Sequence, residues 1–81
     1  MPSVLRTQGY RLFFYSNEGD PREPIHIHVM RAGAEAKIWL GPPVSLAESY
    51  GFNASELRDI IRLVEQHRDT IGRAWHEHFG D

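Results

Sequence analysis

The sequence contains no cysteine. Disulfide bonds, thiolate zinc sites and thiol catalysis are therefore excluded, and a reducing compartment is the natural setting. The sequence also has no apolar run near the roughly 18 residues of a membrane-spanning helix, and no apolar signal segment at its start. We therefore expect a cytoplasmic protein with no membrane attachment.

A surplus of basic residues is missing as well. Nine lysines and arginines stand against 11 acidic residues, which gives a net charge of −2 with neutral histidines. A strong nucleic-acid binder needs clustered positive charge to contact phosphates. The balance argues against that class, although it leaves room for a local basic patch.

The 81 residues have the composition of an ordinary globular protein, 41% hydrophobic and 25% charged. This length predicts a single domain over residues 1–81 with a small core.

The most regular stretch of the chain alternates apolar residues with histidines. In a β-strand this alternation sends Ile25, Ile27 and Val29 to one face and His26 and His28 to the other. The first face suits a hydrophobic core. The second presents two imidazoles, which exchange protons, bind metals or form hydrogen bonds near neutral pH.

A β-hairpin is predicted around a two-residue turn at residues 32–33. The turn places Ile27 opposite Ile38 and His28 opposite Lys37, which keeps both faces consistent; a slip of one residue would mix apolar with charged side chains. The remaining pairs are Ile25–Leu40, His26–Trp39, Val29–Ala36, Met30–Glu35 and Arg31–Ala34.

Two further strands are predicted upstream, over residues 4–6 and 10–15, because aromatic side chains suit a half-buried sheet. Residues 17–22 combine Gly, Asp, Pro and Asn and predict a loop. Residues 44–50 are ambiguous, and we expect a brief extended piece or a single turn there.

The C-terminal third predicts a helix. Asn53 and Glu56 have the spacing of a capping box, and apolar residues recur at three- and four-residue intervals until Gly80 ends the pattern. Arg68 falls inside the apolar stripe. Either it reaches past the end of the sheet or the helix breaks near residues 66–69, and we expect one helix.

Together these patterns predict an α+β fold, an antiparallel meander of about four strands with a C-terminal helix packed on one face. The predicted core consists of Leu12, Phe14, Ile27, Val29, Ile38, Leu57, Ile61, Val64 and Trp75.

Residues 9–18, 23–29 and 34–39, and the ending at residues 74–80, resemble a bacterial family of short proteins known as domain of unknown function 4160. Its central motif usually reads Pro-Pro-His-Ile-His-Val, and Ile25 here replaces the second proline. Members are often encoded beside a second small protein. The resemblance therefore implies an arrangement similar to toxin–antitoxin pairs, and it assigns no catalytic residue.

The sheet face opposite the predicted helix gathers polar and aromatic side chains from three strands, a combination typical of binding sites. We predict that this face is the binding surface. It consists of Arg11, Tyr15, His26, His28, Glu35, Lys37 and Trp39, with Phe13 beside them.

Four interpretations of this face stay open. In the leading one it binds a protein partner, with Trp39 and Tyr15 as the anchors. In the second, His26 and His28 act as general acid and base on RNA or DNA. Lys37 and Arg11 then hold phosphate, and Tyr15 or Trp39 stacks on a base.

In the third interpretation, His26 and His28 bind a divalent metal with Asp20 or Glu23 as a third ligand, which two histidines alone indicate only weakly. In the fourth they are structural and tie the acidic loop to the sheet by hydrogen bonds to Asp20 or Glu23.

We therefore predict a protein-binding component of a two-gene module, without a cofactor, whose partner is a small protein encoded by the adjacent gene. The alternative is a nucleic-acid-binding protein or a ribonuclease, histidine-dependent or metal-assisted. Homo-oligomerisation stays open.

Overall fold

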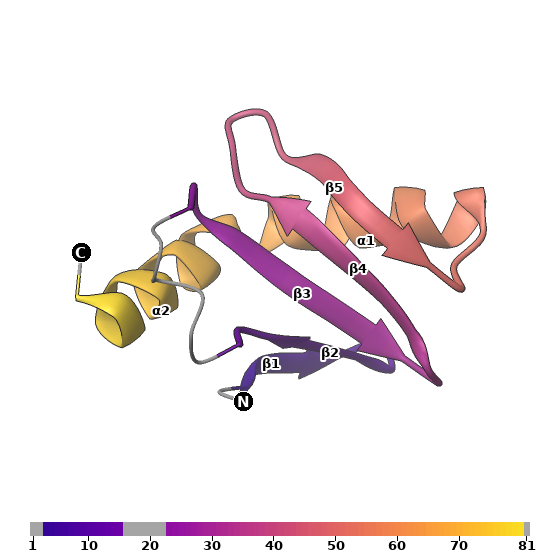
Figure 1. The fold of residues 1–81 in the computed structure, drawn as a ribbon, viewed down its shortest axis with the longest axis horizontal. Helices are drawn as coiled ribbons and strands as arrows, with labels where there is room; N and C mark the ends of the chain where they lie inside the picture. Colours follow the sequence, from indigo (N-terminus) through magenta and orange to yellow (C-terminus); the bar gives the residue numbers. More distant parts are fainter. Residues whose placement is uncertain (1–2, 16–22, 81) are drawn as a thin grey trace.

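The computed structural model describes residues 3–15 and 23–80. Five strands form one antiparallel sheet in the order β1-β2-β3-β4-β5, and two helices follow (Figure 1). The α+β meander is confirmed, with a fifth strand where we expected a brief extended piece or a turn. The elements are β1 (Ser3–Thr7), β2 (Tyr10–Phe13), β3 (His26–Arg31), β4 (Ala34–Trp39), β5 (Ser45–Tyr50), α1 (Ala54–Gln66) and α2 (Arg68–Phe79).

The β3–β4 hairpin has the predicted register. Ile27 faces Ile38 and His28 faces Lys37. The turn residues Ala32 and Gly33 both have positive φ, 50° and 85°, as a two-residue hairpin turn of type I′ requires. The alternation of the two strands therefore fixes the direction of every side chain on them.

β5 is an edge strand with an irregular register. Lys37 of β4 lies opposite Glu48, but the next residue, Ile38, lies opposite Leu46, so Ala47 is a bulge residue. β4 is the only described strand that pairs with β5. The bulge leaves Glu48 and Tyr50 on one face of the sheet and Leu46 on the other.

α1 begins with the capping box that the sequence predicts. Asn53 Oδ1 accepts a hydrogen bond from the Glu56 amide at 2.8 Å, and Glu56 Oε1 accepts one from the Asn53 amide at 2.9 Å. Arg31 Nη2 also donates to Glu56 at 2.9 Å, which ties the start of α1 to the end of β3. The hydrogen bond from the Asn53 backbone, and then the hydrogen bond and charge of Arg31, hold the pKa of Glu56 below its ordinary value.

The helical region breaks at His67, where φ of −109° and ψ of 17° interrupt the helix. The expectation of one helix is wrong, and the alternative of a break near residues 66–69 is right. Arg68 begins α2 and donates from Nε to Leu40 O at 3.1 Å and from Nη2 to Gly41 O at 3.3 Å. Neither helix combines the length and apolar composition needed to cross a membrane.

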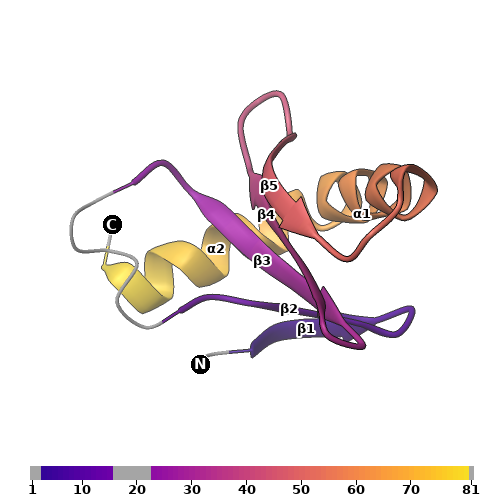
Figure 2. The same cartoon turned by 45° about the vertical axis from the view of Figure 1, so that its right-hand side comes forward.

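Both helices cover the same face of the sheet, behind it in Figure 1, with α1 beside β5 in both views (Figures 1 and 2). The predicted core is confirmed except at Leu57 and Ile61, which are half-buried, whereas Ile60 and Leu63 are buried. α1 is thus turned so that a neighbouring stripe faces the sheet. The confirmed core residues are Leu12, Phe14, Ile27, Val29, Ile38, Val64 and Trp75.

Candidate functional site

The sheet face turned away from the helices, which we call the polar face, brings together residues from β2 to β5. Strand register places them in rows across the sheet. One row contains Phe13, His28, Lys37 and Glu48, and the next contains Arg11, Met30, Glu35 and Tyr50.

His26 lies at the end of β3 and is fully buried. Its ring packs against Trp39 of β4 at 5.5 Å and Trp75 of α2 at 5.1 Å between centroids. Nδ1 lies 2.9 Å from Pro24 O. Because a carbonyl oxygen only accepts hydrogen bonds, this nitrogen is the one that carries the proton. His26 is therefore held by packing on one side and by the backbone on the other.

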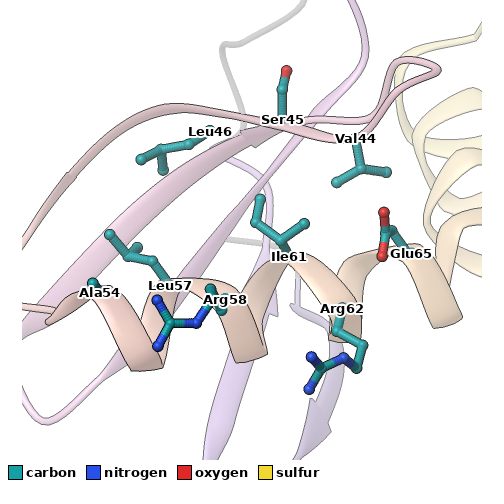
Figure 3. Close-up of a pocket in the computed structure, with 9 residues that line it drawn as sticks. All are labelled: Val44, Ser45, Leu46, Ala54, Leu57, Arg58, Ile61, Arg62 and Glu65. Carbon is teal, nitrogen blue, oxygen red and sulfur yellow. The ribbon is translucent and has the colours of Figure 1, made fainter.

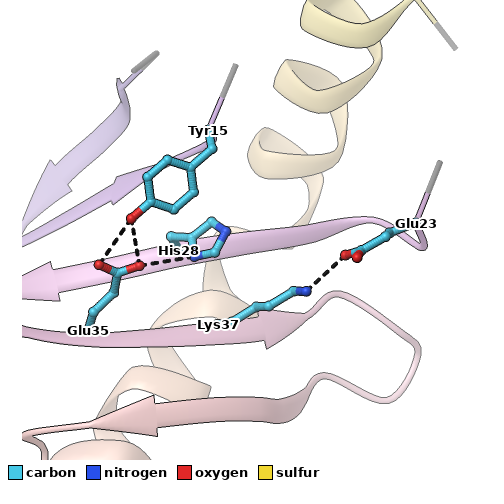
Figure 4. A network of polar contacts seen from close by, with 5 residues as sticks. All are labelled: Tyr15, Glu23, His28, Glu35 and Lys37. Atoms are coloured by element: carbon cyan, nitrogen blue, oxygen red, sulfur yellow. Dashed lines mark hydrogen bonds and ion pairs between the residues drawn. The ribbon is translucent and has the colours of Figure 1, made fainter. Parts of the chain in front are cut away.

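His28 is the centre of a second cluster and is only 7% exposed. Its ring stacks on Phe13 at 5.5 Å and meets Tyr15 edge-on at 4.6 Å. Nδ1 lies 3.3 Å from Glu35 Oε2, and the Tyr15 hydroxyl donates to the same carboxylate at 2.9 and 3.2 Å (Figure 4). Glu35 thus joins an imidazole from β3 to a phenol that follows β2.

Lys37 belongs to a third group that includes Glu23 (Figure 4). Its Nζ lies 2.8 Å from Glu23 Oε1 and 4.6 Å from the centre of the Trp39 ring. Glu23 Oε1 is also 3.7 Å from Nδ1 of His26. Each of the two carboxylates, Glu23 and Glu35, therefore lies beside one histidine and one other polar side chain.

Arg11 lies at the β1 side of the polar face. Its guanidinium stands 4.8 Å from the centre of the Phe13 ring, and Nε donates to Ser3 Oγ at 2.9 Å. Phe13 itself has no exposed surface. Arg11 therefore packs over an aromatic ring that the polar face buries.

The two histidines of the polar face are both buried, which the alternation of the strand alone does not predict. The fourth interpretation, in which the histidines are structural, named Glu23 as a partner, and Glu23 does lie beside His26. Asp20, the other acidic partner named there, and the predicted loop at residues 17–22 lie outside the described residues.

Metal-ligating side chains do not cluster in the part of the chain that the structure describes. No group of three His, Asp or Glu residues is placed there so as to share one ion. His26, His28 and Glu23 come from one short segment, but Nδ1 of His26 lies near Glu23 whereas Nδ1 of His28 lies near Glu35.

β5 contributes residues that the sequence did not single out. Tyr50 is 65% exposed and borders a hollow of about 200 Å³ that also meets His28, Glu35, Lys37 and Glu48. The only signal in the sequence was the alternation of Leu46, Glu48 and Tyr50 with small residues. Serine and alanine gave that strand little intrinsic preference for a sheet.

These features define a small α+β protein in which a meander carries two helices on one face and buries two histidines of β3, of which His26 also contacts α2. Residues 9–76 match the sequence model of the family described as domain of unknown function (DUF4160), and the chain belongs to that family. The predicted family is thereby confirmed. Neither a curated protein nor a solved structure matches the chain.

Proposed function

We propose that this protein works by binding a protein partner on its polar face, as one component of a bacterial two-gene module resembling toxin–antitoxin pairs. The partner is a small protein encoded by the adjacent gene, and the two meet in the cytoplasm. The resemblance of gene arrangement motivates the module, and the construction of the polar face supports the binding.

The observation that carries the proposal is the position of Tyr50. It is the more exposed of the two large apolar side chains that the described residues expose, Leu46 and Tyr50. It stands beside the hollow that reaches Lys37 and Glu35. An exposed aromatic ring next to paired charged groups suits a protein interface, where tyrosine supplies large contact area and one hydrogen bond.

Contacts within the polar face determine which of its side chains are available to a partner. The Tyr15 hydroxyl is occupied by Glu35, and Lys37 covers the Trp39 ring. Of the two predicted anchors, Trp39 offers its remaining half-buried surface to a partner, whereas Tyr15 acts through Glu35. Tyr50 is therefore the first residue to test and Trp39 the second.

The experiment is co-expression with the adjacent open reading frame, followed by copurification and a measured Kd. Tyr50→Ala should weaken binding about tenfold or more, the loss of about 1.4 kcal/mol that is typical of an interface anchor. Arg73→Ala, at an exposed position of α2, is the control and should leave the Kd unchanged. Failure to copurify, or wild-type affinity in both Tyr50→Ala and Trp39→Ala, would rule out this surface.

A histidine-dependent nuclease is the second candidate, because of one contact. Glu35 Oε2 lies 3.3 Å from Nδ1 of His28, and an imidazole beside a carboxylate is a common arrangement in general acid–base catalysis. His28 borders the hollow, and Lys37 would hold phosphate there. In this candidate His28 is the group that touches the substrate.

The nuclease is tested by incubating purified protein with single-stranded RNA, first without added metal and then with manganese or zinc. Cleavage that His28→Ala abolishes, and that His76→Ala at an exposed site of α2 does not affect, would support it. Cleavage that persists in His28→Ala would show that His28 does not carry the reaction and would remove this candidate.

A further inference from the structure

A groove runs between β5 and α1 on the face of the sheet opposite to the polar face (Figure 3). It has a volume of about 550 Å³. In Figure 3, Val44 and Leu46 point toward the helix and Leu57 and Ile61 point toward the strand. Ser45 points away from the groove, and Arg58 and Arg62 lie along its helix-side rim. Its apolar lining comprises Val44, Leu46, Ala54, Leu57 and Ile61.

The groove exists because α1 has two apolar stripes. Ile60, Leu63 and Val64 pack into the core. Leu57 and Ile61, one turn apart on the flank, are only half-buried. Leu46 on the strand above them is 42% exposed. Apolar side chains of the strand and the helix thus line both sides of the groove and remain partly exposed, although burying them would be favourable.

The charge along the groove is mostly positive. Arg58 takes part in no ion pair with another residue of the described ranges 3–15 and 23–80. Arg62 faces Asp59 at 3.6 Å in a pair that is more than half exposed on both sides, and such a pair contributes little. Glu65 stands at one end of the groove. A complementary surface would therefore carry carboxylates beside its apolar residues.

The irregular edge of β5 indicates that a helix, rather than a strand, binds in the groove. A bulge at Ala47 and the charge of Glu48 interrupt the edge of β5, and both features disfavour pairing with another strand. The groove follows α1 from Ala54 to Glu65, about 16 Å at 1.5 Å per residue. This is the length of three helical turns, which suits an amphipathic helix laid between a strand and a helix.

We propose that this groove binds an amphipathic helix of a partner protein. The apolar stripe of that helix packs on Leu46, Leu57 and Ile61, and its acidic side chains lie against Arg58 and Arg62. The site lies on the other side of β5 from Tyr50, so it goes beyond the surface proposed above and does not depend on it.

The test uses two helix-stapled peptides of about 14 residues, long enough for three to four turns. Both carry leucines at i, i+4 and i+7, and they differ only in having glutamate or lysine beside the leucines. Fluorescence anisotropy with the full chain should show that the acidic peptide binds about tenfold tighter or more. Added salt should reduce that preference.

Charge exchange on the protein is the matched control. Arg58→Glu combined with Arg62→Glu changes two exposed positions, so the fold is kept, and circular dichroism checks this. The order of the two peptides should then reverse. Leu57→Gln should weaken both peptides, whereas Tyr50→Ala on the polar face should change neither.

Amide chemical-shift changes in the complex should cluster on β5 and α1. The proposal is overturned if the two peptides bind equally, if neither binds at about 1 mM, or if the shifts map to the polar face. It is also overturned if the protein dimerises and Leu57→Gln breaks the dimer, because a second copy then occupies the groove. None of these results bears on copurification through Tyr50.

Discussion

The two faces of the sheet both bury side chains, but they do so by different contacts. On the helix-covered face, Ile27, Val29 and Ile38 have no exposed surface and touch other apolar groups. On the polar face, His26 and Phe13 are equally buried among rings, a backbone carbonyl and charged side chains. Apolar contacts have no required direction, whereas those of the polar face do. The two faces should therefore respond differently to substitution.

The largest effect is expected in the apolar core. Ile27→Ala should lower the free energy of unfolding by about 2–5 kcal/mol, because it leaves a cavity in a close-packed region. For a domain of this size that is a large share of the total stability. Urea unfolding followed by circular dichroism measures it, with Glu77→Ala on the exposed surface of α2 as the control. A loss no larger than that of Glu77→Ala would contradict the packing described for this face.

A somewhat smaller loss of stability is expected at His26, and part of it comes from a hydrogen bond. His26→Ala should cost about 2–3 kcal/mol, from the lost ring packing and the unpaired Pro24 carbonyl. His26→Phe keeps most of the ring volume and removes only the hydrogen bond, so it should recover part of this loss. Equal stability of the two variants in thermal unfolding would mean that packing has no share in holding this histidine.

The hydrogen bond from Tyr15 to Glu35 offers a still smaller test. Tyr15→Phe removes the hydroxyl but leaves the ring, and should cost about 1 kcal/mol. In a double-mutant cycle with Glu35→Gln, the two losses should not add, since both variants disrupt one contact. Additive losses would show that Tyr15 and Glu35 stabilise the polar face independently.

The smallest effect concerns the pH dependence of stability at Glu56, which belongs to neither face. Its pKa is lower in the folded state than in the unfolded chain. Its stabilisation is therefore complete above the ordinary pKa of a glutamate and disappears as the pH falls through the lowered value. Glu56→Gln should be less stable than the wild type near neutral pH, and the difference should vanish in acid. A difference that is constant with pH would contradict this role of the carboxylate.

The elements predictable from the sequence were those whose signals are local. The period-two alternation from Ile25 to Val29 fixed the β3–β4 register, since only one pairing separates apolar from charged side chains. Asn53 and Glu56 marked the start of α1 because a capping box is a contact within one turn. The polar-face positions of His28, Lys37 and Glu35 also followed from that register.

The remainder depended on contacts between distant segments. The break at His67 accompanies hydrogen bonds from Arg68 to the exit of β4, 27 and more positions away. The burial of His26 requires Trp75 of α2. β5 forms by pairing with β4, because its own residues have little strand preference. The periodicity of residues within one segment carries no information about these contacts between distant segments.

The helix break at His67 also shortens the helical region so that it fits the dimensions of the molecule. A single helix from Ala54 to Phe79 would be about 39 Å long, which exceeds the 34 Å of the molecule's longest axis. Divided into 13 and 12 residues, the same chain gives two rods of about 20 and 18 Å. The six-residue strands β3, β4 and β5 are each about 20 Å long and therefore match helices of that length. The break at His67 therefore lets both α1 and α2 pack against the same small sheet.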